Sequence, residues 1–319
     1  MRAGRVLITG GTGSLGTHIL ATAERERWDT DFIVYSRDEA KQARLRERFP
    51  AVECVLGDIR DRGDLTRAMR GCDVVVHTAA YKRVPEAERQ SKVCIDANVY
   101  GSLNVALAAL ANRVEHVVGI STDKACSPIN TYGQSKALME RLWQSFARES
   151  RGTQFHLTRY GNVIASNGSV IPLWRKQASE GKPVTVTFPD MTRFWLTLDD
   201  AVDLIIASLD TPSGDILIPA CPSSTMAVLA EAVAPGVEQT TIGSRGGERM
   251  HERLICEEEA PYTSGHRMGY LLGPLSSAVR DEMPDGWVLS SSTTKRLTSD
   301  RLRAVVDDLD AGTETRLLG

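Results

Sequence analysis

The feature that most constrains this chain is a regular alternation of short apolar runs and longer helical patterns through its first half. Runs rich in Val and Ile recur at 5–10, 31–36, 52–57, 73–80 and 116–122, with helical patterns such as 16–27 and 38–49 between them. Strands separated by helices of this length pair in parallel, because a parallel connection needs a long crossover. Near-continuous apolar strands fit burial on both faces. The pattern predicts an α/β fold with a Rossmann-like doubly wound parallel sheet.

The second half of the chain follows a looser pattern. A long helix at 129–150 and a strand at 153–164 extend the alternation, but beyond about residue 167 short strands and helices mix. We therefore expect a Rossmann domain over residues 1–166 and a smaller mixed α/β lobe over residues 167–319. Some segments of the lobe are expected to return to the main sheet.

Composition excludes several classes of function. The 319 residues carry a net charge of −3, which gives no reason to expect nucleic acid as a partner. No apolar run approaches the ~20 residues that span a bilayer, so no membrane association is expected. The first strand begins too near Met1 to leave room for a signal peptide, and a cytoplasmic location is expected. The six cysteines show no metal-ligand spacing, which predicts free thiols and no metal.

A glycine-rich turn, TGGTGSLG, lies between the first strand and the first helix. The first glycine of such a motif allows a tight turn, the second lets the backbone approach a pyrophosphate, and the third lets helix pack on strand. Backbone N–H groups at the helix start then face the phosphates. This context favours a dinucleotide over a merely structural turn. The residues expected to hold it are Gly10, Thr12, Gly13, Ser14, Leu15 and Gly16.

The end of the second strand bears on which dinucleotide binds. An NAD site usually has an acidic residue there. Here Ser36 and Arg37 occupy the tip, and Asp38 comes only afterwards. A guanidinium can hold a ribose 2′-phosphate by charge-assisted hydrogen bonds, so NADP is favoured. NAD stays the alternative, in which Asp38 turns inward and Arg37 is a solvated charge.

Two further strand ends are expected to face the cofactor. Asp58 and Ile59 follow the third strand, where they would edge and cover an adenine. Ala79 and Ala80 end the fourth strand, and their small side chains leave space for a cofactor.

The stretch STDKACSPINTYGQSK is the candidate catalytic segment. Thr122 ends a strand, where open α/β sheets place their ligands. Tyr132 and Lys136 are four residues apart and share a helix face. A lysine ammonium beside a phenol lowers the pKa of the tyrosine, which can then take a proton from an alcohol while hydride leaves the same carbon for nicotinamide. The alternative is an ordinary helix pair beside an ordinary surface ion pair, Asp123–Lys124.

These segments carry a resemblance to a known family. The chain resembles the extended short-chain dehydrogenase/reductases that modify nucleotide sugars, and more narrowly the inverting UDP-N-acetylglucosamine 4,6-dehydratases of the pseudaminic-acid and capsule pathways. The phrases that carry it run from about residue 5 to residue 255: TGGTGSLG, YSRDEAKQ, GDIRD, HTAAYKRVPEAE, STDKACSPINTYGQSK, RYGNVIASNGSVIP, MTRFWLTLDDAVDLI and GERMHERL. STDKA together with MTRFW is typical of this branch.

The resemblance implies roles for individual residues. Thr122, Tyr132 and Lys136 would act in oxidation at sugar C4. Asp123 would be the acid that protonates the departing 6-hydroxyl, and Lys124 the base that removes the C5 proton. Lys82 and Asn98 would line the pocket beside the cofactor. The residues implied for the UDP-sugar are Lys82, Asn162, Val170, Arg193, Arg245 and Glu248, with Asn162 and Arg193 at the diphosphate and Glu248 near the uridine ribose. A homo-oligomer, dimer or hexamer, is also implied.

Two other functions stay open. One is a C4 or multi-centre epimerase of the same superfamily, which uses the same ketone chemistry without losing water. Asp123 and Lys124 favour the dehydratase, because a simple C4 epimerase needs neither. The other is a non-catalytic NADP-sensing protein, against which the intact Tyr132 and Lys136 argue. One tension accompanies the dehydratase: the acid should be protonated and the base neutral, yet adjacent opposite charges favour both ions.

Overall fold

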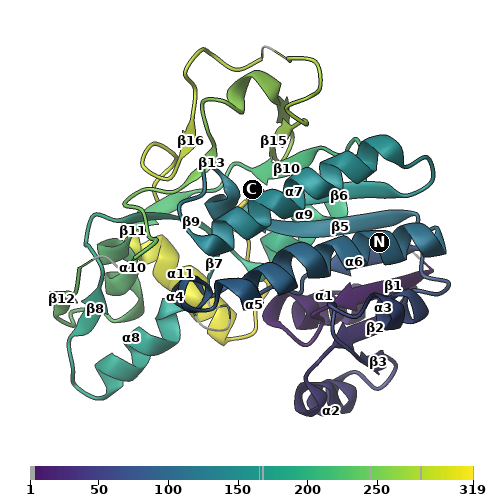
Figure 1. The fold of residues 1–319 in the computed structure, drawn as a ribbon. Coiled ribbons are helices and arrows are strands. Elements are labelled where there is room, and N and C mark those ends of the chain that lie inside the picture. Colours follow the sequence, from purple (N-terminus) through teal and green to yellow (C-terminus); the bar gives the residue numbers. More distant parts are fainter. Residues whose placement is uncertain (1–3, 165, 167–168, 244–245, 281, 319) are drawn as a thin grey trace.

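The computed structural model describes residues 4–164, 166, 169–243, 246–280 and 282–318 (Figure 1). Within these residues the main sheet has nine strands in the order β14-β15-β10-β6-β5-β4-β1-β2-β3. The strands from β3 to β10 run parallel, and β15 and β14 add antiparallel at the β10 edge. The predicted Rossmann-like parallel sheet is therefore confirmed. The bounds of its strands are β1 Arg5–Thr9, β2 Asp31–Ser36, β3 Glu53–Leu56, β4 Val74–His77, β5 His116–Thr122, β6 Gln154–Tyr160, β10 Ile216–Pro219, β14 Thr263–His266 and β15 Gly269–Leu272.

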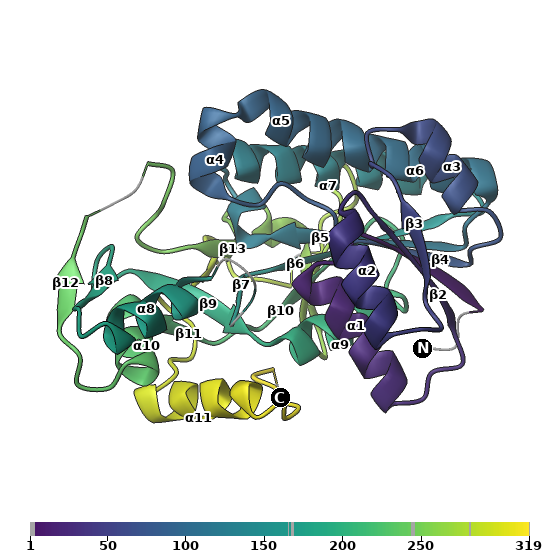
Figure 2. The ribbon, with the colours of Figure 1, turned by 90° about the horizontal axis from the view of Figure 1, so that it is seen from below.

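Helices cover both faces of this sheet (Figure 2). One face carries α3 (Arg62–Ala68), α6 (Gly101–Asn112) and α7 (Thr131–Glu149); the other carries α1 (Ser14–Arg25), α2 (Glu39–Arg48) and α9 (Leu198–Ser208). Successive side chains of β1 point to opposite faces of the sheet, which explains why the strands are apolar throughout. Leu7 packs into one core, while Val6 and Ile8 pack into another, and all three are fully buried. Burying both faces requires an apolar residue at nearly every position.

The predicted strand at 153–164 is broken in the structure, which corrects that expectation. Its first part is β6, and after Gly161 the chain leaves the main sheet to form β7 (Asn162–Val163), which pairs with β9 (Thr192–Leu196). A Cβ at Gly161 would lie 2.4 Å from the Cβ of Phe194, so only glycine fits at this crossing. The break turns Asn162 away from the sheet, toward the smaller lobe.

The smaller lobe has its own apolar core. It is formed by side chains such as Trp174, Trp195, Leu229 and Leu302, all buried. The lobe's elements, besides β7 and β9, are α8 Val170–Ser179, β8 Val184–Val186, β11 Ser223–Thr225, α10 Met226–Val233, β12 Gln239–Thr241 and α11 Ser299–Asp310. The remaining short elements are α4 Val84–Arg89, α5 Ser91–Ile95, β13 Arg253–Ile255, β16 Leu289–Ser290, a π-helical turn at Asp96–Tyr100 and 3₁₀ turns at Asp123–Ala125 and Ala260–Tyr262.

A continuous helical run, Ser91–Asn112, is long and apolar enough to cross a membrane by length and composition. This corrects the expectation that no stretch approaches that length; α5, the π-helical turn and α6 simply continue one another. Within the fold, α6 packs against α3 and α7 (Figure 2). Val105, Ala106, Ala108 and Ala109 are fully buried, so this apolar side of α6 forms part of the core.

A buried ion cluster ties three distant segments together. Arg159 on β6 donates to both carboxylate oxygens of Glu140 on α7, at 2.9 and 2.7 Å, and to both oxygens of Glu259, at 2.8 Å each. It also donates to the carbonyl of Leu254 on β13 at 2.9 Å. Every donor nitrogen of the guanidinium thus finds an acceptor, which is the condition under which a buried charge is tolerated.

Arg159→Met should lower the free energy of unfolding by roughly 3–5 kcal/mol, because it leaves the buried carboxylates of Glu140 and Glu259 without the positive charge that they pair with. Urea unfolding followed by circular dichroism measures the change. Arg175→Met is the matched control: its partner Asp310 is half exposed, and the loss should stay below about 1 kcal/mol. Similar losses for the two variants would contradict this account.

The same cluster sets a pH dependence. Burial alone would raise the pKa of Glu259, but the Arg159 charge and hydrogen bonds lower it below its ordinary value of 4.5. A carboxyl with a lowered folded-state pKa stabilises the fold above the unfolded-state value and loses that contribution as pH falls. The stability difference between the wild type and Arg159→Met should therefore shrink below about pH 4.5.

Candidate functional site

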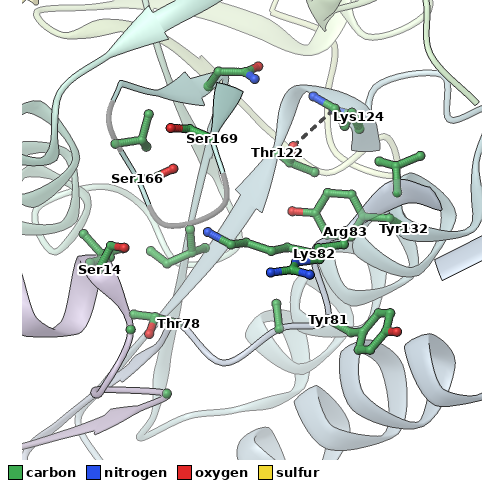
Figure 3. Close-up of a pocket in the computed structure, with 18 of the residues that line it drawn as sticks. Ser14, Thr78, Tyr81, Lys82, Arg83, Thr122, Lys124, Tyr132, Ser166 and Ser169 are labelled. Carbon is green, nitrogen blue, oxygen red and sulfur yellow. Dashed lines mark hydrogen bonds between the residues drawn. The ribbon is translucent and has the colours of Figure 1, made fainter. Parts of the chain in front are cut away.

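A continuous cavity of about 900 Å³ runs along the carboxyl ends of the parallel strands and into the smaller lobe. Ser36 at the tip of β2 lines one end, the glycine turn after β1 and the strand ends Thr78 and Thr122 come next in sheet order, and Trp174 and Thr185 line the lobe end. Figure 3 shows side chains from both halves of the chain around it. This is the edge where parallel α/β sheets bind ligands.

The glycine turn lies at the cavity as predicted for a phosphate-binding loop. Gly10 has a φ of +67°, and a Cβ there would lie 2.7 Å from the Cα of Ala79. A Cβ at Gly16 would lie 2.4 Å from the Cα of Gly11, so this glycine permits helix-to-strand packing and does not itself line the cavity. Gly10, Thr12, Gly13, Ser14 and Leu15 do line it.

At the tip of β2 the two candidate ligands of a ribose take different positions. Arg37 lines the cavity with its side chain 65% exposed, and its Nη1 lies 3.9 Å from Asp58 Oδ2. Asp38 also lines the cavity, but it caps α2: its Oδ1 accepts from the backbone N–H of Lys41 at 3.0 Å, and its Oδ2 lies 3.3 Å from Lys41 Nζ. The carboxylate of Asp38 is therefore engaged locally, whereas Arg37 is available to a ligand.

The other residues predicted for the cofactor divide into two groups. Ser36, Asp58, Ile59, Ala79, Ala80 and Lys82 line the cavity. Asn98 does not, because it is fully buried and its amide accepts from the backbone of Tyr81 at 2.7 Å and donates to Ser135 at 2.9 Å. Its amide therefore holds the chain that leads into Lys82 instead of reaching the cavity.

Lys82 extends into the cavity (Figure 3). Desolvation there, together with the neighbouring Arg83 charge, lowers the pKa of its ammonium. A cation placed this way would gain from an anionic ligand, because the ligand would offset the desolvation cost.

Thr122, Tyr132 and Lys136 meet at the cavity, but not with the predicted electrostatics. Burial raises the pKa of Tyr132 to about 12, against the lowering effects of Lys124 and of a hydrogen bond with Thr122. Lys136 donates to the carbonyl of Ile120 at 2.7 Å, and burial lowers its pKa to about 8. The expectation that Lys136 lowers the pKa of Tyr132 is therefore wrong: the charge acting on the phenol is Lys124, and burial outweighs it.

Packing against α7 places the Asp123–Lys124 turn beside Tyr132. Asn130 caps the helix by accepting from the N–H of Gly133 at 2.7 Å. A Cβ at Gly133 would lie 2.1 Å from the carbonyl oxygen of Lys124, so glycine is required for this approach.

Lys124 lies between two carboxylates. Its Nζ donates to Asp123 Oδ1 at 2.9 Å and lies 3.7 Å from Glu252 Oε1. Burial lowers the pKa of Lys124, but Asp123 and Glu252 outweigh it and hold the pKa above its ordinary value. Thr122 also donates to Asp123 Oδ1, at 2.9 Å, while Asp123 Oδ2 is buried and has no hydrogen-bond partner among the described residues. Lys124 lines the cavity and Asp123 lies behind it.

Glu252 is the residue that sequence reasoning missed. It is 4% exposed, and its Oε1 also lies 3.9 Å from Nε of Arg193. Glu252 stands in the GERMHERL segment, but nothing in its spacing connects it with Lys124. Only the fold brings these two residues together.

The residues predicted for the UDP-sugar mostly reach the cavity. Asn162, Val170, Arg193 and Glu248 line it, and Arg245 lies outside the described residues. Asn162 Oδ1, Ser169 Oγ and Glu248 Oε2 are buried without a hydrogen-bond partner among the described residues. Because such atoms are costly to bury unpaired, polar ligand groups are expected at this end. Arg193 differs from these unpaired groups, because its Nη1 already has hydrogen-bond partners: it donates to the carbonyls of Thr192 and Arg249, at 2.7 and 3.0 Å.

Together these features fit a nicotinamide dinucleotide and a second polar ligand. The glycine turn gives the close approach that a pyrophosphate needs, and the unpaired polar atoms mark a separate region toward the lobe. Between them lie a phenol, a threonine hydroxyl and an amine, the groups needed to move protons to and from a bound alcohol.

Comparison with known proteins agrees with this arrangement. The family model described as "Polysaccharide biosynthesis protein" matches residues 6–272. The chain is 39% identical over 275 residues to UDP-N-acetylglucosamine 4,6-dehydratase (inverting) of Campylobacter jejuni, covering 84% of this chain and 82% of that protein. It is also 43% identical over 266 residues to a protein of Rickettsia massiliae named UDP-glucose 4-epimerase, covering 80% and 78%.

Solved structures show the same fold. Pen from Bacillus thuringiensis superposes with a TM-score of 0.87 at 32% identity, covering 96% of this chain and 99% of that one. DesIV, a dTDP-glucose 4,6-dehydratase from Streptomyces venezuelae solved with NAD and TYD bound, superposes with a TM-score of 0.69 at 25% identity, covering 77% and 86%.

Removing the second carboxylate should change the titration of Lys124. In Glu252→Gln the pKa of Lys124 should fall, because one of the two charges that raise it is gone while burial remains. NMR of protein labelled at the lysine ε-carbon measures this shift. Glu248→Gln is the matched control, since it removes a charge that does not pair with Lys124, and its Lys124 resonance should titrate as in the wild type. An unchanged Lys124 titration in Glu252→Gln would contradict the pairing.

Proposed function

The chain belongs to the family of polysaccharide biosynthesis proteins, and from this premise we propose that it is a UDP-N-acetylglucosamine 4,6-dehydratase that inverts C5. The observation that carries the proposal is Lys124 at the cavity, hydrogen-bonded to Asp123 and two residues after Thr122. An epimerase acting only at C4 has no need of a base and an acid there. The Campylobacter relatives named for this activity support the same conclusion.

The cofactor that we propose is tightly bound NADP. The glycine turn would hold its pyrophosphate, and Arg37 its 2′-phosphate, because Asp38 is engaged in capping α2. When bound, a nicotinamide cofactor supplies hydride acceptance from sugar C4 and hydride return to C6. It ends the cycle unchanged, which is why it can stay bound.

Tyr132 is placed to take the proton of the sugar 4-hydroxyl. The Lys124 charge and the nearby Thr122 hydroxyl both lower the pKa of Tyr132 and so favour the phenolate. Burial works against that form, so a cationic ligand group nearby would assist. Oxidation makes C4 a ketone, and the C5 proton becomes acidic because it is now α to a carbonyl.

Lys124 and Asp123 carry out the elimination in this proposal. Lys124 removes the C5 proton, a C5–C6 double bond forms, and the C6–O bond breaks as Asp123 protonates the departing hydroxyl to give water. The required forms are a neutral amine and a carboxylic acid. Transfer of one proton along the 2.9 Å hydrogen bond from Lys124 to Asp123 converts the ion pair into this combination. Reprotonation of C5 from the opposite face then inverts it.

A UDP-sugar 4-epimerase is the second candidate. The observation in its favour is the set of Rickettsia relatives named UDP-glucose 4-epimerase, which are 42–43% identical over about four fifths of this chain. The product decides between the two candidates. A homo-oligomer, dimer or hexamer, and a cytoplasmic location stay predictions.

Purified protein should bind NADP more tightly than NAD, because Arg37 pairs with the 2′-phosphate. Arg37→Ala should narrow that difference by roughly tenfold, about the contribution of a charge-assisted hydrogen bond. Calorimetric titration with both dinucleotides measures it. Arg44→Ala on α2, the helix that follows Arg37, lies outside the cavity and is the matched control; it should leave the ratio unchanged. Equal affinities in the unmodified protein would count against Arg37 in this role.

With UDP-N-acetylglucosamine and no added reductant, NMR should show a UDP-4-keto-6-deoxy-sugar. In D₂O, deuterium should appear at C5, because the proton removed there exchanges with solvent, while the hydrogen delivered to C6 should come from C4. Lys124→Ala should lower the rate of product formation by about two to four orders of magnitude, the usual worth of a general base. Asp123→Asn should likewise stop water loss.

Lys124→Ala and Asp123→Asn should both still bind the cofactor. Retained binding would show that the loss of activity does not come from unfolding. Lys124→Ala making the deoxy-keto sugar at nearly the wild-type rate would refute the assignment of the base. Release of a C4 epimer with its 6-hydroxyl retained would establish the epimerase instead.

A further inference from the structure

Two buried thiols meet just behind the catalytic turn. Cys126 directly follows the 3₁₀ turn Asp123–Ala125, and Cys256 directly follows β13. Their sulfurs and a carboxylate oxygen of Glu259 all lie within 4.8 Å of one another. Cys126 is 2% exposed and Cys256 6% exposed. The two cysteines come from opposite halves of the chain, so their meeting is a property of the fold.

These thiols lie in the contact that also aligns Lys124 with Glu252. We call it the turn–strand contact: residues 123–127 on one side and residues 249–256 on the other. Within it, Arg249 donates to the carbonyl of Ser127, and Ser127 has a positive φ of 45°, unusual for a residue other than glycine. A change at the thiols would therefore be passed directly to Lys124, two residues before Cys126.

The two thiols differ in reactivity. The neighbouring Cys126 thiol is the main cause that lowers the pKa of Cys256, whereas the Cys256 thiol and burial raise the pKa of Cys126 well above its ordinary value. The thiolate is the form that oxidants attack, so Cys256 is the first target. The Cys126 thiol has a proton acceptor close by, since it donates to Glu259 Oε2 at 3.5 Å.

A metal ion is a poor alternative at the same place. Glu259, the third potential ligand, already accepts from Arg159 at 2.8 Å with each oxygen and from the backbone N–H of Cys256 at 3.2 Å. A divalent cation bound here would be repelled by the positive charge of Arg159. The chemistry of this cluster therefore favours sulfur oxidation.

We propose that Cys126 and Cys256 form a reversible disulfide in response to a peroxide. The Cys256 thiolate attacks one oxygen of hydrogen peroxide, its O–O bond breaks, and the sulfur becomes a sulfenic acid while the other oxygen leaves as water after gaining a proton. The sulfur of Cys126 then attacks the sulfenic sulfur, the S–O bond breaks, and the hydroxide takes the Cys126 proton to leave as a second water. A dithiol reductant returns both thiols.

The disulfide should also slow the enzyme, a consequence that rests on the proposed function. A disulfide requires its sulfurs to approach to about 2.05 Å, well inside their present separation, so the turn must shift against β13. That shift would misalign Lys124 with Glu252 and with the sugar. Displacements of this size at a catalytic group cost up to roughly 100-fold in rate. We expect about a 10- to 100-fold loss of dehydration on oxidation, restored by reductant.

The test is mass spectrometry of the intact protein after graded exposure to hydrogen peroxide. The wild type should lose the mass of two hydrogen atoms, and a peptide pair joining Cys126 to Cys256 should appear and vanish with a dithiol. In Cys126→Ser the protein should gain one oxygen atom at Cys256, and in Cys256→Ser residue 126 should stay reduced at the same dose. Cys54→Ser is the matched control, because Cys54 is more accessible and lies on β3, and its response should equal that of the wild type.

Each result bears on the proposal. Oxidation of Cys54 while Cys126 and Cys256 stay free would overturn it, as would a stoichiometric metal in the purified protein that is lost in Cys256→Ser. A disulfide that forms without any loss of rate would refute only its coupling to Lys124. The mass readout does not depend on the substrate, so failure of the proposed function remains distinguishable from failure of this modification site.

Discussion

The buried guanidinium of Arg159 is the interaction on which the geometry of the site depends. Its ion pairs and hydrogen bonds reach α7, which carries Tyr132 and Lys136, and the segment at 254–259, which follows Glu252 in the chain. Arg159 thus holds the two sides of the cavity to β6, and its guanidinium stays protonated at any ordinary pH. Removing any one of these charged side chains leaves a buried charge that neither water nor an ion-pair partner stabilises. The cluster therefore opposes small displacements of the segments that carry it.

Charge balance around Lys124 is the second constraint. One lysine faces two carboxylates, Asp123 and Glu252, and the second of these also faces Arg193. The two carboxylates raise the pKa of Lys124 and so favour its charged form. A ligand that displaces Arg193 or contacts Lys124 would change that balance. Two members of this set act on the pKa of Tyr132: the Lys124 charge lowers it and the Asp123 charge raises it.

Sequence reasoning succeeded where function depends on local pattern. The parallel sheet followed from alternating apolar runs, the glycine turn from its place after the first strand, and the position of Tyr132 beside the cavity from its place on a helix after Thr122. It failed where residues distant in sequence meet. Glu252 and Lys124 are distant in sequence, and only the fold pairs them. The break at Gly161 arises where the chain passes close to Phe194 on β9. The side-chain amide of Asn98 makes its hydrogen bonds to Tyr81 and Ser135 and so does not reach the cavity. The pKa of Tyr132 was mispredicted because helix spacing reports which side chains share a face but not how deeply they are buried.

The place of β10 in the sheet has a consequence for synthesis on the ribosome. β6 pairs with β5 on one edge, but its other edge is covered only by β10, and the whole of the chain from Asn162 to Asp215 is made in between. At about 5–20 residues per second, the roughly 55 intervening residues take about 3–11 s to emerge. During that interval the nascent chain presents an open strand edge whose hydrogen-bonding groups have no partner. A chaperone that covers extended backbone, or rapidly translated codons between β6 and β10 that shorten the exposure of that edge, should therefore affect the yield of this enzyme more than its final stability.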